Sequence, residues 1–411
     1  MAIRCHGFRG YATCGSVARA MSYGLWRALA VMVSLSACHG NGAGAIAEMP
    51  AAEAFLRNYA DIAFAGYSDA ATGARTLLRA VDGLTAAPSQ ARLELARKAW
   101  IEARVPYLQT EGFRFYDGPI DEVEMLVNTW PIDESYIEST GGAGGGIVDD
   151  AKTYPELTID LLKSLNAKDG ETSISTGYHA VEFLLWGRDT SETGPGDRSP
   201  HDYEQGTSDD PAPRRRGAYL HFATELLVQQ MDQLARAWAP SLPNNYRAAF
   251  LSTPPREALA RVIRGMGALS GPELGGERLT VAYETKDQEN EHSCFSDNTH
   301  NDVIFDARGV ANIGAGHYER TDGTAVAGLG LCDVVQSRDP HLAEQLRHDL
   351  EASVAAARSI PAPFDRAIIG SDDAPGRVAV HRTIQSLEAQ AATLTKVAST
   401  LGLSAARAAR R

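Results

Sequence analysis

Helical periodicity dominates the chain, because apolar residues recur three and four positions apart in segments rich in Ala, Leu, Glu and Arg. Runs in which Val, Ile or Thr alternate with polar residues are scarce. Cap and stop residues agree with this pattern, as where Ser89 precedes one apolar-periodic segment and Gly187 follows another. The pattern predicts helices over 51–66, 70–84, 90–115, 156–165, 176–186, 217–238, 256–269, 277–289, 340–358 and 376–401.

Two breaks interrupt these helices, a glycine-rich stretch over 141–146 and a longer polar stretch over 187–217. The second exceeds an ordinary connection in a packed bundle, so we expect it to be a surface loop that can close over a cleft. The helices then divide into two groups of similar number. We therefore expect an all-α fold of two packed, four-helix-bundle-like domains, covering 50–200 and 201–411, with a functional cleft between them.

The first 38 residues have the composition of an export signal. Residues 1–37 contain four arginines and no acidic residue, and a short apolar run over 28–33 follows Arg27. The sequence Leu-Ser-Ala-Cys that ends at Cys38 resembles the box at which bacterial lipoproteins are cleaved and lipidated. We expect residues 1–38 to be a lipoprotein signal peptide with its lipobox, Cys38 to carry the lipid and 39–49 to be a flexible tether. Plain secretion is the alternative, and translation starts at Met1 or Met21.

Charge and hydropathy restrict the partners of the chain. Its formal net charge of −13 becomes −17 once residues 1–37 are removed, and this negative field disfavours nucleic acid and favours cations or neutral ligands. No internal apolar run reaches the roughly 18–20 residues of a spanning helix, so we expect contact with the membrane through the lipid anchor only. His39 replaces the Asp that commonly retains lipoproteins at the inner membrane, which favours the outer membrane, facing the periplasm. In that oxidising compartment Cys294 and Cys332 either form a disulfide or remain two isolated thiols.

One histidine–carboxylate pair is a candidate for chemistry. The chain lacks HExxH, GxGxxG, P-loop and GxSxG motifs, which removes zincin, dinucleotide-binding, NTPase and hydrolase interpretations. His179 and Glu182 stand three residues apart on a predicted helix, so both side chains leave the same face and can meet one cation. Their apolar surroundings make an unpaired charge costly. Histidine and glutamate have the same spacing at 341/344 and 348/351, but there they lie on a charged helix typical of a solvated face. For His179 and Glu182, the alternative to a metal site is a buried hydrogen bond between the two side chains.

Two further segments collect polar and aromatic residues. The first spans 100–114 and places five side chains on one helical face: Trp100, Arg104, Tyr107, Glu111 and Arg114. The aromatic residues indicate that this face is covered, so we expect its carboxylate to meet a partner. The second spans 289–302 and has the highest density of histidine and carboxylate in the chain, although its Ser-Asp-Asn-Thr run is also typical of a capped loop.

These three segments resemble the imelysin family of bacterial envelope proteins. The family's Gly-x-His-x-x-Glu signature is matched by Gly177, His179 and Glu182, and its Glu-His-Ser-Cys-Phe-Ser-Asp-Asn-Thr block by 291–299. Two shorter elements, Thr-Glu-x-Phe-Arg-Phe and Gly-Pro-Ile-Asp, are matched over 110–121. The resemblance implies two helical bundles with the signature near their interface. It also implies an activity in iron acquisition or as a metallopeptidase.

We therefore expect the cleft to bind a divalent metal ion, iron or zinc, or a metal-containing small ligand, and to act with envelope iron-uptake components. The expected metal ligands are His179, Glu182 and Glu111, with Arg104 and Arg114 orienting the carboxylates. The other residues expected to line the cleft are Gly177, Glu289, Glu291, Ser296, Asp297, Asn298 and Thr299.

Two other functions remain open from the sequence. A metallopeptidase would use His179 and Glu182 with an activated water, but a peptidase zinc usually takes three protein ligands and a separate base, which favours binding over proteolysis. A non-metal module for a peptide or an envelope polysaccharide would keep the pair as a structural hydrogen bond.

Overall fold

The structure is a computed structural model that describes residues 43–139, 145–191, 194–207 and 210–403. Within these residues it is predominantly helical, as the sequence pattern predicts, and two short strands form a hairpin. The expected signal peptide with Cys38 lies outside the described residues, whereas part of the expected tether, from Ala43 onward, is already helical. None of the described helices is both long and apolar enough to cross a membrane.

Most elements follow one another with short connections, and the longer ones include residues 114–123, 138–158 and 187–199. The α-helices are α1 (Ala43–Ala86), α2 (Gln90–Leu108), α3 (Glu134–Ile137), α4 (Ile159–Leu165), α5 (Gly177–Trp186), α6 (Ala212–Trp238), α7 (Tyr246–Ser252), α8 (Pro255–Ala268), α9 (Val281–Thr285), α10 (Thr299–Ala315), α11 (Leu331–Gln336), α12 (Pro340–Arg358), α13 (Phe364–Ile368) and α14 (Pro375–Thr400). Short 3-10 segments are η1 (Glu111–Phe113), η2 (Glu124–Leu126), η3 (Pro200–Tyr203) and η5 (Gln288–Asn290), η4 (Leu269–Thr280) is π-helical, and the antiparallel hairpin pairs β1 (His317–Glu319) with β2 (Ala325–Ala327).

Helix α1 is continuous where the sequence predicted two helices, 51–66 and 70–84. The polar residues that looked like a break have partners elsewhere in the fold. The carboxylate of Asp69 accepts hydrogen bonds from the Tyr318 hydroxyl at 3.0 Å and the Arg320 guanidinium at 2.6 Å, both from the hairpin region. Because tertiary contacts satisfy Asp69, the helix continues through it instead of ending there.

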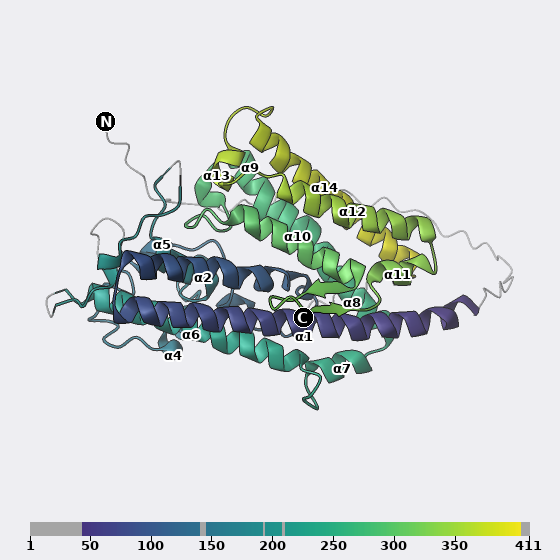
Figure 1. The fold of residues 1–411 in the computed structure, drawn as a ribbon, viewed down its shortest axis with the longest axis horizontal. Coiled ribbons are helices and arrows are strands. Elements are labelled where there is room, and N and C mark those ends of the chain that lie inside the picture. Colours follow the sequence, from purple (N-terminus) through teal and green to yellow (C-terminus); the bar gives the residue numbers. More distant parts are fainter. Residues whose placement is uncertain (1–42, 140–144, 192–193, 208–209, 404–411) are drawn as a thin grey trace, which may run out of the picture. The chain divides into compact units, whose positions relative to one another are not determined.

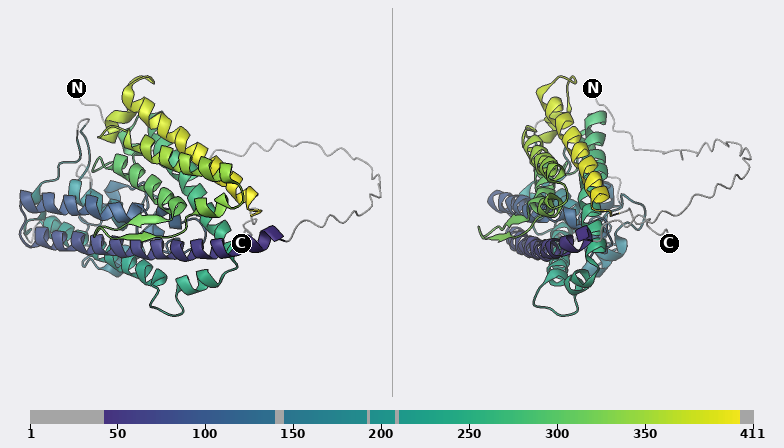
Figure 2. Two further views of the ribbon diagram at one scale, coloured as in Figure 1. Left: turned by 45° about the vertical axis from the view of Figure 1, so that its right-hand side comes forward. Right: turned by 90° about the vertical axis from the view of Figure 1, so that its right-hand side faces the viewer.

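The helices pack as two groups that meet along α2 and α10 (Figures 1 and 2). In the first group α1 packs against both α2 and α6, and α5 contacts α2 and α6. In the second, α12 packs against both α10 and α14, and α14 also contacts α8 and η4. Helix α6 thus packs on α1 although it follows residue 200, and the division into domains 50–200 and 201–411 with a cleft between them stays a prediction.

An aromatic cluster joins the N-terminal helix to elements that lie far away in the sequence. The ring of Tyr59 on α1 lies 5.0 Å from that of Phe113, 6.0 Å from Trp238 and 5.5 Å from Phe250, measured between ring centroids. All four side chains are buried. Such rings bury large apolar areas, so this cluster fixes α1 against η1, α6 and α7.

Helix α10 was not predicted. The Ser-Asp-Asn-Thr run before it resembled a helix stop, but in the structure it leads into a helix whose N-terminal cap is Asn298. Turn-forming residues precede helices as readily as they follow them, so this signal was ambiguous. Nearby, Cys294 and the distant Cys332 are both buried free thiols, and they do not form a disulfide in this structure.

Candidate functional site

Helix α5 begins at a close approach to the backbone of residues 127 and 128. Gly177 has a φ of 88°, and a Cβ atom at this position would lie 2.5 Å from the carbonyl oxygen of Val127. The amide of Tyr178 donates to that same carbonyl at 2.7 Å. Only glycine tolerates both the conformation and the contact. Gly177, expected to line the cleft, therefore acts by setting where α5 enters the interior.

The expected pair is formed and buried. Nδ1 of His179 lies 2.9 Å from Oε2 of Glu182, and both side chains are at most 1% exposed. The other carboxylate oxygen, Oε1, accepts hydrogen bonds from the amide and the hydroxyl of Ser296, at 3.0 and 2.6 Å. Both oxygens of Glu182 are thus engaged, one by its own helix and one by the segment 291–299.

A second histidine–carboxylate pair lies beside the first. The ring centroids of His179 and His292 are 4.6 Å apart in an edge-to-face arrangement. Nδ1 of His292 lies 2.7 Å from Oδ2 of Asp302. Sequence reasoning did not single out His292 or Asp302 as site residues, although both belong to the histidine- and carboxylate-rich stretch 289–302.

Asp302 is the centre of a buried hydrogen-bond network. Arg104 donates to it through Nε at 3.0 Å and Nη2 at 2.7 Å, and both side chains are at most 1% exposed. The Ser293 hydroxyl and the Asn298 amide also donate to this carboxylate, at 2.5 and 3.2 Å. Arg104 completes its contacts with Oδ1 of Asn128 at 3.0 Å. Arg104 therefore orients the carboxylate of Asp302, and its expected role beside a metal ligand stays a prediction.

The environment keeps both imidazoles neutral. Burial, together with the neighbouring His292, holds the pKa of His179 well below its usual range. Burial and the positive charge of Arg278 lower the pKa of His292 to about 4, although Asp302 opposes this shift. Burial raises the pKa of Glu182 to about 8, against the opposing effect of the Ser296 hydroxyl. Neutral imidazole is the form that binds metals.

The free ring nitrogens define what this pair of histidines can do. Carboxylates engage Nδ1 of both rings, so Nε2 is the nitrogen that remains on each. Nε2 of His179 is buried and has no hydrogen-bond partner among the described residues. Metal-binding histidines typically use one nitrogen for the metal and hold the other against a carboxylate. His179 matches that arrangement, and His292 shares the contact between Nδ1 and a carboxylate.

Glu111 lies in a different cluster. Its Oε2 is 2.7 Å from both Nη1 of Arg114 and Nη2 of Arg278, and Arg278 also reaches Asp306 at 2.8 Å. Burial alone would raise the pKa of Glu111, but the two guanidinium groups outweigh it and hold the pKa well below the usual range. Arg114 contacts Glu111, but the structure places neither of them in contact with His179 or Glu182. A metal-binding role for Glu111 stays a prediction.

The remaining expected residues separate into two sets. Ser296, Asn298 and Thr299 belong to the network around the two histidines, with Thr299 Oγ1 accepting from the amide of Ser293 at 2.9 Å. Glu291 and Asp297 are buried outside that network, and Glu289 is exposed.

Glu291 and Asp297 lie near other carboxylates. Burial, together with Asp365, raises the pKa of Glu291 well above its usual range, and the same causes raise that of Asp297 to about 7. Both carboxylate oxygens of Glu291 are buried without a hydrogen-bond partner. These carboxyl groups therefore destabilise the fold when they are ionised.

The protein does not present a complete set of metal ligands. Among the residues that the structure describes, no three side chains of His, Cys, Asp or Glu come together as a metal site would require. The donor set at the two histidines is two neutral nitrogens. It fits a metal that brings ligands of its own better than a bare ion.

Comparisons with known proteins agree with this fold. The sequence profile of the imelysin family matches residues 63–394. Iron-regulated protein A of Synechococcus elongatus is 25% identical over 337 residues, which cover 80% of this chain and 81% of that protein. Among solved structures, an iron-regulated protein A precursor from Parabacteroides distasonis has a TM-score of 0.68 at 19% identity, covering 86% of this chain and 95% of that one. An imelysin-like protein from Psychrobacter arcticum has a TM-score of 0.58 at 12% identity, with coverages of 86% and 96%. The chain belongs to the imelysin family.

Proposed function

We propose that this protein is a binding protein of the bacterial envelope that takes part in iron acquisition and holds a metal-containing small ligand at His179 and His292. The observation that carries the proposal is the buried, unpartnered Nε2 of His179 beside a second neutral imidazole. The iron in the names of two of its relatives supports the link to iron. A lipid on Cys38 would tether the protein to the outer membrane, facing the periplasm and other iron-uptake components.

The number of donors favours a complexed metal. Two imidazoles fill only part of the coordination shell of iron or zinc, so the incoming ligand must supply the rest. Once ionised, Glu182 and Asp302 would each hold one ring in the tautomer that leaves Nε2 free. Both rings are neutral at pH 7, but the pKa of Glu182 is raised to about 8, so metal binding at pH 7 would release the proton of this carboxyl.

The same contacts argue against peptidase chemistry. A peptidase zinc needs three protein ligands, and its general base must reach a metal-bound water. Here both oxygens of Glu182 are engaged, by His179 and Ser296. The pair therefore supplies one ligand and its orienting carboxylate, which is the part of a site that binding and catalysis share.

The test is metal binding by the purified protein and two histidine variants. His201 provides a matched control, because Nδ1 of His201 contacts Glu204 at the same three-residue spacing but the ring is 79% exposed. We expect ferric citrate, measured by calorimetry and elemental analysis, to occupy one site per chain in the wild type and in His201→Ala, and Zn²⁺ to bind there more weakly. His179→Ala should lose this site. Equal binding by His179→Ala, or no stoichiometric metal in the wild type, would contradict the proposal.

A further inference from the structure

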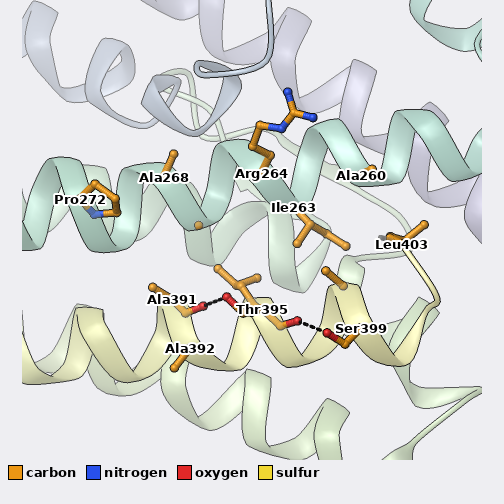
Figure 3. Close-up of a pocket in the computed structure, with 13 residues that line it drawn as sticks. Ala260, Ile263, Arg264, Ala268, Pro272, Ala391, Ala392, Thr395, Ser399 and Leu403 are labelled. Atoms are coloured by element: carbon orange, nitrogen blue, oxygen red, sulfur yellow. Dashed lines mark hydrogen bonds between the residues drawn. The ribbon is translucent and has the colours of Figure 1, made fainter. Parts of the chain in front are cut away.

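An apolar groove lies between α8 with η4 on one side and α14 on the other (Figure 3). It encloses about 550 Å³, a volume typical of small-molecule sites. Three buried apolar side chains line it, those of Ile263, Leu394 and Leu403. The rest of the lining is mostly small residues, Ala260, Gly267, Ala268, Ala391, Ala392 and Ala398, together with Arg264, Pro272, Thr395 and Ser399.

A second, basic pocket of about 400 Å³ adjoins this groove and shares Ala260, Arg264 and Leu403 with it. Three arginines line it, against the carboxylates of Asp117 and Glu257. These arginines are Arg256, Arg261 and Arg264.

The described residues balance the charges of these arginines only in part. Arg261 pairs with Glu257 at 2.7 Å, whereas Arg256 donates to a backbone carbonyl, that of Gly402, at 2.5 Å. Arg264 forms no hydrogen bond or ion pair with any other described residue. Figure 3 shows its side chain leaving α8 on the side away from α14, at the edge of the groove. An apolar groove thus adjoins a cationic pocket, in a chain whose net charge is −13.

We propose that the groove and the basic pocket together bind one long-chain fatty acid, with its alkyl chain along α14 and its carboxylate on Arg264. The apolar lining matches the alkyl chain, which gains about 0.8 kcal/mol for each CH₂ group that it buries. A guanidinium binds a carboxylate through two parallel hydrogen bonds, and no other described residue occupies that of Arg264. The C-terminal residues 404–411 are another candidate occupant, since they follow Leu403 directly in the sequence. They carry three arginines, however, and the positive charge of the pocket would repel these.

Calorimetric titration of the purified protein with dodecanoate tests this proposal. We expect one dodecanoate per chain, with binding roughly tenfold or more weaker in Arg264→Gln, about what losing a hydrogen bond to a charged group costs. Arg382 is a matched control, because it is also exposed and lies on α14 but does not line either pocket. Arg382→Gln should bind as the wild type does. Thr395→Trp, which fills the groove from an exposed position, should reduce binding more than tenfold.

Several results would overturn the proposal. These are no binding of dodecanoate by the wild type, equal loss in Arg264→Gln and Arg382→Gln, or binding of dodecanol as tight as that of dodecanoate. Tighter binding by a chain that ends at Leu403 would assign the groove to the C-terminal residues. Dissociation of a dimer on addition of dodecanoate, measured by analytical ultracentrifugation, would assign it to a second copy of the chain. Circular dichroism of each variant separates loss of binding from loss of fold.

Discussion

The substitution Asp302→Asn removes the charge at the centre of the buried network while keeping the shape of the side chain. In the wild type this carboxylate accepts two hydrogen bonds from Arg104 and one each from Ser293 and Asn298, and it contacts Nδ1 of His292. After the substitution, the guanidinium of Arg104 stays buried with only neutral partners, one of which is Asn128.

The expected cost follows from that burial. Removing one partner of a fully buried ion pair costs about 3–5 kcal/mol, because the other charge is left uncompensated. Arg104 is 0% exposed and Asp302 1%, so solvent cannot replace the lost charge. The loss is a large share of the roughly 5–15 kcal/mol that holds a typical domain folded. It also removes the carboxylate that Nδ1 of His292 contacts, so metal binding should weaken together with stability.

Urea unfolding at pH 7.5, followed by circular dichroism, measures this change in the free energy of unfolding. Glu102→Gln is the control, since Glu102 pairs with Lys98 on the surface and both side chains are more than half exposed. That variant should lose less than about 1 kcal/mol. A loss of under about 1 kcal/mol in Asp302→Asn, or a loss equal to that in Glu102→Gln, would refute the reasoning.

Two further predictions concern backbone approach and buried charge. Gly177→Ala should lower the free energy of unfolding in urea by about 2 kcal/mol or more, because the added Cβ would meet the Val127 carbonyl and the residue has a φ of 88°. The control is Gly83→Ala within α1, which should be neutral or stabilising because a Cβ there meets no other atom. Equal effects of the two substitutions would contradict this. Glu291→Gln should raise the melting temperature at pH 8, because burial and Asp365 raise the folded-state pKa of Glu291 above its ordinary 4.5. The carboxyl of Glu291 therefore destabilises the wild type less as the pH falls toward 4.5. The gain in melting temperature from Gln should be smaller at pH 5 than at pH 8. A gain that does not depend on pH would contradict this prediction.

Local patterns in the sequence predicted much of the helical fold. Helix α12 has the predicted bounds, 340–358, and α5 begins within one residue of its prediction. The pair of His179 and Glu182 was also predictable, because their contact follows from helix geometry alone. Spacing of three residues on one helix leaves little freedom for the two side chains.

Helix α10 and its carboxylates were missed for a physical reason. Its buried face carries Asp302 and Asp306 among apolar residues such as Val303 and Val310, so apolar periodicity appears weak there. Asp302 is buried because Arg104 meets it from 198 positions away in the sequence, and no local pattern encodes that contact. The same applies to His292, which lies beside His179 only after the chain has folded.

The most direct test of the metal-binding account is anomalous diffraction from crystals of the protein grown with Zn²⁺ or ferric citrate. The account predicts one strong metal peak within bonding distance, about 2.0–2.1 Å for zinc, of Nε2 of both His179 and His292. A peak at Glu291 and Asp297 instead, or none at the two histidines in a metal-loaded crystal, would contradict it.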